Sequence, residues 1–264
     1  MSVADEIGAN LPYLRRYARA LTGSQSAGDT YVRATLEAAL ADPDLRDRIG
    51  GGRIPLYAAF NRIWSSGHVD VSDPDREAGV REEAVQTRLA NITPAHRQAL
   101  LLTTLEEFSN AEAATILELS ENEIEALVSQ AIEEIDSSAA TEVLIIEDEP
   151  LIAMQLEEIV ADLGHTVVGT AATHSQAVEI FSRSPAGLVL ADIQLADGSS
   201  GIEAVEELLS FGDVPVIFIS AYPERLLTGE RPEPTYLVTK PFREETVRAA
   251  IGQALFFGTS KPLG

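Results

Sequence analysis

The pattern of apolar residues changes abruptly near residue 140, and this change constrains the fold more than any other feature of the chain. Upstream, apolar residues recur at helical spacing and strand signals are almost absent. Downstream, short runs rich in β-branched residues alternate with helical stretches. Five such runs are present, at residues 143–146, 166–168, 188–190, 214–219 and 236–238.

Continuous apolar strands that alternate with helices are typical of a doubly wound parallel sheet. We therefore predict two domains. An all-α helical domain occupies residues 1–136, and an α/β doubly wound domain with a five-stranded parallel sheet occupies residues 141–258.

Acidic side chains follow two of the apolar runs, where the predicted strands end. Glu147 and Asp148 come directly after the first run, and Asp192 comes just after the third. Because the carboxyl ends of parallel strands meet at the same edge of a sheet, we expect these three side chains to converge. Mg²⁺ prefers oxygen ligands in an octahedron that retains some waters. The sequence therefore predicts a magnesium site at this edge.

Two further polar residues end the remaining strands of the predicted sheet. Ser220 closes the fourth strand and Lys240 follows the fifth. A hydroxyl and an ammonium beside carboxylates and a metal suit the transfer of a phosphoryl group to Asp192, because Lys240 offsets charge on the phosphoryl oxygens and Ser220 donates to one of them. Each residue alone has an ordinary explanation as a helix cap or turn residue. Together, the residue types at these strand ends favour the functional interpretation.

The same positions resemble the signature segments of two-component receiver domains. These segments are VLIIEDEP at 143–150, LVLADIQLADGSSG at 188–201, VIFISAY at 216–222 and VTKPF at 238–242. The resemblance implies a flavodoxin-like fold, an upstream sensor histidine kinase or phosphotransfer protein, and a cis peptide bond before Pro241. It also implies individual roles: Asp192 as phosphoacceptor, Glu147 and Asp148 as acidic metal-site residues, the backbone carbonyl of Gln194 as a metal ligand, and Ser220 and Lys240 as switch residues.

Two features depart from the receiver pattern. Receivers usually carry an aromatic switch residue three positions before the lysine, whereas this chain has Leu237 there and Tyr236 one position earlier. Residues 221–234 contain three prolines, so the helix usually found there is expected to be short or irregular.

The helical domain ends in a helix-turn-helix pattern. Ser109 with Glu112, and Ser120 with Glu123, fit two capping boxes. They predict the starts of a short helix and a longer one, which is the helix-turn-helix layout.

The charge of this segment is unsuited to DNA. Residues 93–136 contain one fixed basic residue, Arg97, against ten acidic residues, a net of −9. Proteins bind duplex DNA by placing Lys and Arg against the phosphates, so we expect no direct DNA binding. A solvated acidic face is the simpler explanation of the same pattern.

The helical domain resembles extracytoplasmic-function sigma factors. Residues 17–40 and 54–64 resemble the promoter-melting region, and 93–135 resemble the promoter-reading region four. The basic cluster that usually follows the third helix is replaced by SSGHVDVSDPD. The resemblance divides the domain into a region-two-like part (1–66), a linker (67–80) and a region-four-like part (81–136).

A sigma-like domain in front of a receiver resembles the PhyR family of alphaproteobacterial general stress response regulators. The resemblance implies partner switching: the sigma-like domain sequesters an anti-sigma factor of the NepR type and thereby releases the general stress sigma factor. The unphosphorylated receiver is expected to dock on the sigma-like domain, and phosphorylation of Asp192 to expose the partner surface.

Two other classes of function share part of this pattern. A DNA-binding two-component regulator would use the helix-turn-helix directly. An aspartate-based phosphatase would need a second acid two residues after Asp192, where this chain has Gln194. We therefore expect a protein that is not an enzyme, apart from the slow self-dephosphorylation typical of receivers.

The composition favours a cytoplasmic protein, and its acidity suits either a basic protein partner or simply solubility. The chain has no Cys and a formal net charge of −23, and it shows neither a secretion signal nor an apolar stretch near the ~20 residues of a membrane span. Anionic membranes and nucleic acids are poor partners for such a chain.

Overall fold

The structure, a computed structural model, describes residues 3–66, 95–136, 139–195, 198, 200–212, 214–222 and 234–257. The chain divides into two compact units, Met1–Ala131 and Ile132–Gly264. The predicted linker at 67–80 and the beginning of the region-four-like part lie outside the described residues, as does most of the proline-containing segment 221–234.

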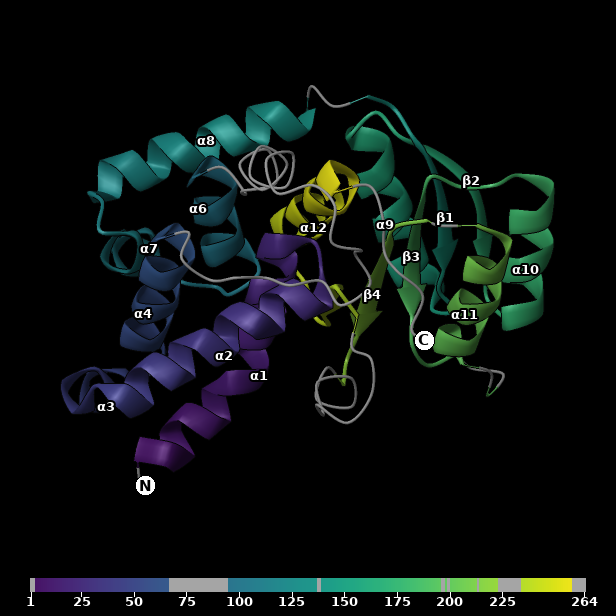
Figure 1. The fold of residues 1–264 in the computed structure, drawn as a ribbon. Helices are drawn as coiled ribbons and strands as arrows, with labels where there is room; N and C mark the ends of the chain where they lie inside the picture. Colours follow the sequence, from purple (N-terminus) through teal and green to yellow (C-terminus); the bar gives the residue numbers. More distant parts are fainter. Residues whose placement is uncertain are drawn as a thin grey trace, which may run out of the picture. The chain divides into compact units, whose positions relative to one another are not determined.

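All regular secondary structure described in the first unit is helical (Figure 1). Its helices are α1 (Val3–Thr22), α2 (Gln25–Ala41), α3 (Pro43–Ile49), α4 (Arg53–Ser66), α6 (Ala95–Thr104), α7 (Asn110–Leu117) and the greater part of α8 (Glu121–Asp136). Helices α1 and α6 are in contact, and so are α4 and α7, so the two sequence segments that flank the predicted linker pack together.

A glycine and two short polar residues set helix ends in the first unit. Gly23 ends α1 in the left-handed region at φ 66°, and Ser24 then caps α2 by accepting a hydrogen bond from the Ala27 N–H. Asp42 ends α2, and its carboxylate accepts from the N–H groups of Asp44 and Leu45 at the start of α3.

The core of the first unit forms where α1, α2 and α4 cross. Its largest fully buried apolar side chains include Leu14, Tyr17, Leu21, Leu56, Tyr57 and Phe60. Helices α1 and α2 approach so closely that a Cβ atom at Gly28 would lie 2.8 Å from the backbone nitrogen of Arg19. Glycine is therefore required for this crossing.

The two predicted capping boxes are both present. Ser109 accepts from the N–H of Glu112, whose carboxylate accepts from the Ser109 N–H at 2.8 Å. Ser120 and Glu123 form the same pair of bonds at 2.8 and 3.3 Å. Helices α7 and α8 therefore begin where the sequence predicted.

The structure corrects the surface charge that the sequence suggested for the helix-turn-helix segment, residues 93–136. Arg97 is buried, so the segment's one fixed cation is largely withheld from the surface. Glu106 is buried as well, and does not belong to the acidic face. Helix α8 itself carries no Lys or Arg, and its exposed acids are Glu121, Glu123, Glu125, Glu133 and Asp136.

The second unit contains the predicted five-stranded parallel sheet, in the order β2-β1-β3-β4-β5. Its strands are β1 (Glu142–Ile146), β2 (Thr166–Ala171), β3 (Leu188–Asp192), β4 (Val216–Ser220) and β5 (Tyr236–Thr239). The doubly wound fold class is therefore confirmed.

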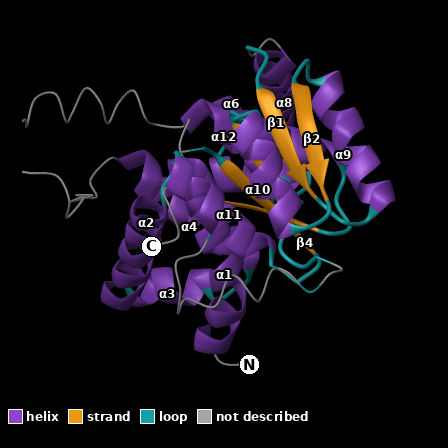
Figure 2. Cartoon of the chain, turned by 90° about the vertical axis from the view of Figure 1, so that its right-hand side faces the viewer, coloured by secondary structure: helices purple, strands orange, loops and turns teal. Residues whose placement is uncertain are grey.

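Helices cover both faces of this sheet (Figures 1 and 2). They are α9 (Pro150–Asp162), α10 (His174–Arg183), α11 (Gly201–Phe211) and α12 (Glu244–Phe257). Helices α10 and α11 contact each other on one face, and α9 contacts α12 on the other. The resulting layers leave the carboxyl ends of the strands available for a site.

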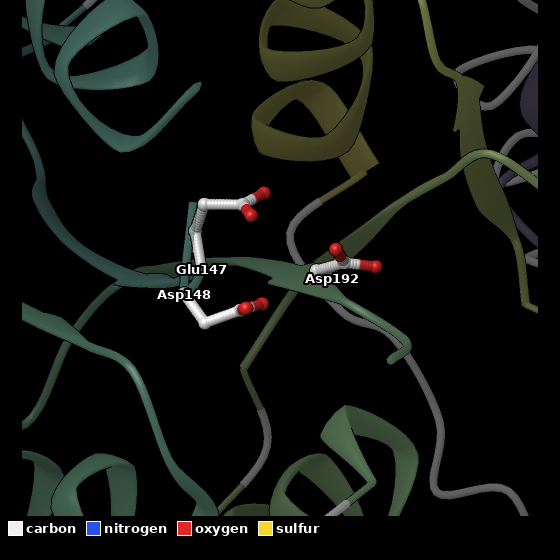
Figure 3. Close-up of side chains that lie close together, drawn as sticks. All are labelled: Glu147, Asp148 and Asp192. Carbon is white, nitrogen blue, oxygen red and sulfur yellow. The ribbon is translucent and has the colours of Figure 1, made fainter. Parts of the chain in front are cut away.

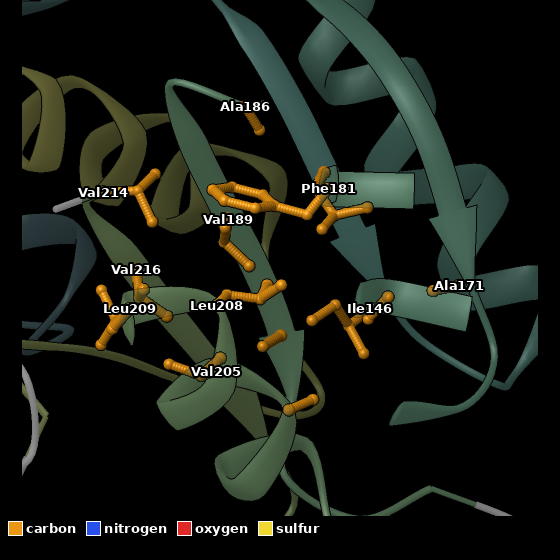
Figure 4. Packing of buried hydrophobic residues seen from close by; sticks show 14 of the residues in the cluster. Ile146, Ala171, Phe181, Ala186, Val189, Val205, Leu208, Leu209, Val214 and Val216 are labelled. Atoms are coloured by element: carbon orange, nitrogen blue, oxygen red, sulfur yellow. The ribbon is translucent and has the colours of Figure 1, made fainter. Parts of the chain in front are cut away.

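One apolar cluster joins the sheet to α10 and α11 (Figure 4). Phe181 from α10 and Leu208 from α11 pack against Val189 of β3 and Ile146 of β1. This packing holds α10 and α11 against the sheet, in which the pairing of β1 with β3 places their carboxyl ends side by side. Among the described residues, no helix has the length and apolar character needed to cross a membrane.

Candidate functional site

The candidate site lies at the carboxyl ends of β1 and β3. Ile146 of β1 is the register partner of Ala191 of β3, so Glu147 and Asp192, one residue further along each chain, are neighbours. The Glu147 N–H donates to the Ala171 carbonyl at 2.8 Å, which also ties this position to β2. Strand pairing alone therefore brings two carboxylates together.

Three carboxylates converge at this edge, as the sequence predicted. Glu147, Asp148 and Asp192 each offer a carboxylate oxygen, and these oxygens lie within 4.8 Å of one another (Figure 3). Glu147 and Asp192 are buried, whereas Asp148 is half-buried. Solvent thus reaches the cluster from the side of Asp148.

Lys240 neutralises part of this charge. Its Nζ donates to Glu147 Oε2 at 2.8 Å and to Asp192 Oδ2 at 2.8 Å, and it lies 3.7 Å from an oxygen of Glu149. The Lys240–Pro241 peptide bond is cis, as expected, and the Lys240 N–H donates to the Ser220 carbonyl at 2.7 Å. One ammonium therefore links residues from three strand ends.

Burial and charge act against each other in this cluster. Burial raises the pKa of Glu147 above its ordinary value, because desolvation outweighs the stabilising contact with Lys240. Burial alone would lower the pKa of Lys240, but its hydrogen bonds to Asp192 and Glu147 outweigh desolvation and raise that pKa. The lysine is therefore held as an ammonium beside Asp192.

Gln194 lies two residues after Asp192 in the chain, and Ser220 follows Ile219, the register partner of Asp192 in the neighbouring strand β4. Ser220 is the last residue of β4 and is buried, and its hydroxyl accepts from the Tyr222 N–H at 3.0 Å. The Gln194 N–H donates to Asp192 Oδ1 at 3.2 Å. Each of the two Asp192 carboxylate oxygens therefore accepts a hydrogen bond, one from Gln194 and the other from Lys240.

Sequence reasoning assigned no role to Gly201 or Glu149. A Cβ atom at Gly201 would lie 1.7 Å from the backbone oxygen of Asp192, and the Gly201 N–H donates to the Ile193 carbonyl at 2.9 Å. The glycine at the end of LADGSSG was the available signal. Glu149 directly follows the predicted acidic pair and is the third carboxylate near Lys240.

Tyr236 and Leu237, the two residues at which the chain departs from the receiver pattern, are both buried. Leu237 is buried and belongs to the apolar cluster on the side of α10 and α11. Tyr236 is 2% exposed, and its hydroxyl donates to the Gln253 carbonyl at 3.4 Å. An aromatic ring therefore lies next to the usual switch position, but packed toward α12.

The donor set fits a hard divalent cation. The convergent atoms are all carboxylate oxygens, which suit Mg²⁺ better than metals that prefer nitrogen or sulfur ligands. The cluster holds three acids against one ammonium, so it has negative charge left to balance. These residues can therefore hold a metal ion.

Three family models match successive parts of the chain. The Sigma2 domain of PhyR matches residues 7–61, and the sigma-like domain of the response regulator PhyR matches residues 89–138. The response regulator receiver domain matches residues 143–252. The matches follow the same order as the predicted parts of the chain.

Relatives of known name match over nearly the whole length. The phyllosphere-induced regulator PhyR of Methylorubrum extorquens is 53% identical, and the match covers 98% of this chain and 97% of that protein. The crystal structure of the anti-anti-sigma factor PhyR from Bartonella quintana is 48% identical with a TM-score of 0.82, covering 97% of this chain and 96% of that one. A co-crystal of the Bartonella quintana protein with the anti-sigma factor NepR shares 48% identity and has a TM-score of 0.40, covering 97% and 99% of the two chains.

Proposed function

Because this chain belongs to the PhyR family of response regulators, we propose that it acts as a phosphorylation-activated mimic of a sigma factor. In this function the helical domain, residues 1–136, binds an anti-sigma factor of the NepR type, and the receiver domain, residues 141–258, controls the binding. The Bartonella quintana relative that has been solved with NepR supports this partner class. Such a protein would act in the cytoplasm, beside the transcription machinery.

The observation that carries the proposal is the pair of bonds from Lys240 to Glu147 and Asp192 within a cluster of three acids. Asp192 is the proposed phosphoacceptor: one of its oxygens attacks the phosphorus of a donor phosphohistidine, and the bond from phosphorus to the histidine nitrogen breaks. A phosphoaspartate results, and the donor histidine becomes free again.

The other site residues have defined tasks in this proposal. Lys240 offsets the charge of the phosphoryl oxygens, and the Ser220 hydroxyl turns from Tyr222 to donate to one of them. Glu147, Asp148, Asp192 and the backbone carbonyl of Gln194 would hold Mg²⁺, which supplies further positive charge when bound.

Phosphorylation is proposed to act by changing the docking of the receiver. In the unphosphorylated state the receiver covers the partner surface of the helical domain, and the phosphoryl group weakens that docking. Tyr236 is buried, with its hydroxyl bonded to the Gln253 carbonyl of α12, and our proposal assigns no role to this ring.

We propose that the protein neither binds DNA directly nor works as an enzyme. Helix α8, the second helix of the helix-turn-helix, offers exposed acids and no Lys or Arg to phosphates. Gln194 occupies the position at which aspartate-based phosphatases carry a second acid. Slow hydrolysis of the phosphoaspartate is the reaction expected at this site.

Capture of an anti-sigma factor tests the proposal. The full chain is mixed with a NepR-type protein, with and without Mg²⁺ and a small phosphoryl donor, and binding is measured by calorimetry. Asp192→Asn should abolish the increase in affinity caused by the donor. Asp162→Asn, at an exposed position at the end of α9, is the matched control and should respond like the wild type. A full response of Asp192→Asn to the donor would contradict the proposed phosphoacceptor.

A further inference from the structure

A buried carboxylate lies at the junction between the segments that flank the predicted linker. Glu106 follows α6, and its side chain is fully buried. Its Oε1 accepts from Arg16 of α1 at 3.0 Å. Its Oε2 accepts from Arg53 at 3.0 Å and from the Tyr57 hydroxyl at 2.7 Å, both from α4. Both carboxylate oxygens are therefore held by elements from the other side of the linker.

The same two arginines also hold the backbone of the turn between α6 and α7. Arg16 Nη2 donates to the Leu105 carbonyl at 2.9 Å, and Arg53 Nη2 donates to the Glu106 carbonyl at 3.0 Å. The Arg53 guanidinium carbon lies 4.6 Å from the centroid of the Phe108 ring, in the range of cation–π contacts. Each guanidinium thus binds a main-chain atom as well as the carboxylate.

The chemistry of this cluster makes the contact specific. Burial and the negative charge of Glu106 raise the pKa of Tyr57 well above its ordinary value, so the phenol stays protonated and donates. A buried carboxylate without its partners is strongly unfavourable. If the turn moved away from α1 and α4, the buried carboxylate of Glu106 would lose its bonds to Arg16, Arg53 and Tyr57 together. The cluster therefore favours one arrangement of the turn over displaced ones.

Other contacts across this junction are weaker or less specific. Arg62 of α4 forms an ion pair with Glu118 at the end of α7, but both side chains are exposed, and such pairs contribute little. Helices α4 and α7 are also in contact, but a small shift between them does not by itself leave a buried charge without its partner, which is the costly event. Glu106 is therefore the contact that fixes the geometry.

We propose that Glu106 is a positioning residue, which locks α6 and α7 onto α1 and α4 so that both segments present one preset surface to the partner. This inference rests on the proposed function, and assigns a role to a residue outside the phosphoacceptor site. A partner that spans both segments binds more tightly when their arrangement is fixed in advance, because no ordering cost falls on the binding step.

Distance measurements on the full chain test this role directly. The chain contains no Cys, so spin labels can be placed on Glu37→Cys in α2 and Thr115→Cys in α7, both exposed positions. The unsubstituted background should give one narrow distance distribution by double electron–electron resonance. Glu106→Gln should broaden it, and Tyr57→Phe, which removes one hydrogen bond, should broaden it less. Glu107→Gln, at the exposed neighbouring position, is the matched control and should leave it narrow.

Affinity for the NepR-type partner, under phosphorylating conditions, supplies the second readout. We expect Glu106→Gln to bind at least tenfold more weakly than Glu107→Gln, with Tyr57→Phe between them. A folded Glu106→Gln protein with an unchanged distance distribution would overturn the proposal, and so would a broadened distribution with unchanged affinity.

The test still decides if Glu106→Gln does not fold or if the wild type does not bind the partner. If circular dichroism shows that Glu106→Gln does not fold, Tyr57→Phe and Arg53→Gln are judged by the same two criteria. If even the wild type fails to capture the partner, the proposed function is wrong, and the distance distributions alone then decide whether Glu106 locks the junction.

Discussion

Gly201 lies against the backbone of Asp192 so closely that a Cβ atom at position 201 would stand 1.7 Å from the Asp192 carbonyl oxygen. This distance is far below any van der Waals contact, and the obstructing atom belongs to the main chain of β3. The start of α11 and the candidate phosphoacceptor can therefore keep their places only with glycine at this position.

Gly201→Ala is expected to displace the end of β3 and with it the Asp192 carboxylate. Overpacking of this kind costs about 1–3 kcal/mol of unfolding free energy. Phosphorylation by a small donor should also slow, which a phosphate-affinity gel can follow in time. Gly212→Ala is the control, since nothing lies within 4 Å of a Cβ atom there. Equal phosphorylation rates in the two variants would contradict a positioning role for Gly201.

Lys240→Met is expected to destabilise the receiver in the absence of divalent cations. Glu147 and Asp192 would lose a shared ammonium at 2.8 Å from each, and breaking a buried ion pair costs about 3–5 kcal/mol. Mg²⁺ should then raise the melting temperature of the variant more than that of the wild type, because the cation replaces the missing charge. Thermal unfolding with and without Mg²⁺ measures both effects. Arg183→Gln, at an exposed position, should leave the response to Mg²⁺ unchanged.

The capping box of α8 predicts a pH dependence of helix stability. Hydrogen bonds from the Ser120 hydroxyl and N–H lower the pKa of Glu123 below its ordinary value of 4.5. The folded state therefore favours the charged carboxylate, so its contribution is fully present above pH 4.5 and is lost as the pH falls through the lowered pKa.

Titration of the Glu123 side-chain carboxyl by NMR checks this expectation. Ser120→Ala removes the hydroxyl donor and should move the pKa of Glu123 back toward 4.5. An unchanged pKa in Ser120→Ala would show that the hydroxyl does not stabilise the charged form.

A larger side chain at Gly252 of α12 is expected to destabilise the protein, because Gly252 packs against the last turn of α8. A Cβ atom at Gly252 would lie 2.4 Å from Cγ1 of Ile135, a buried side chain. Gly252→Ala is therefore expected to lower the unfolding free energy by about 1–3 kcal/mol. Combining it with Ile135→Val removes a methyl group from the crowded side and should recover part of the loss. Additive effects in this double-mutant cycle would rule out direct packing between the two positions.

The sequence was sufficient for the sheet and for the convergence of the acids, because both depend on local patterns. Apolar runs determine the strands, and parallel pairing then brings Glu147 and Asp192 together without further information. The capping boxes were equally predictable, since the residues of each box are only three positions apart.

The burial of Glu106 could not be foreseen in this way. The sequence count placed it among the surface acids of the helix-turn-helix, but its partners Arg16 and Arg53 are 90 and 53 residues away. Nothing near Glu106 in the chain distinguishes it from its exposed neighbour Glu107. The tight approach at Gly201 was hidden for a related reason, because it depends on how α11 packs against the end of β3 rather than on the identity of the residue alone.

The hydrogen bonds of Lys240 have a mechanical consequence for the sheet. Among the strands that the structure describes, β5 is the shortest and stands at one edge of the sheet beside β4. Lys240 directly follows β5, and its ammonium donates hydrogen bonds to Asp192 at the end of β3 and to Glu147 just after β1. Besides its pairing with β4, the end of β5 is therefore linked to the two central strands through one ammonium. A chemical change at Asp192 that alters its bond to Lys240 is therefore expected to alter how the end of β5 is held against the central strands.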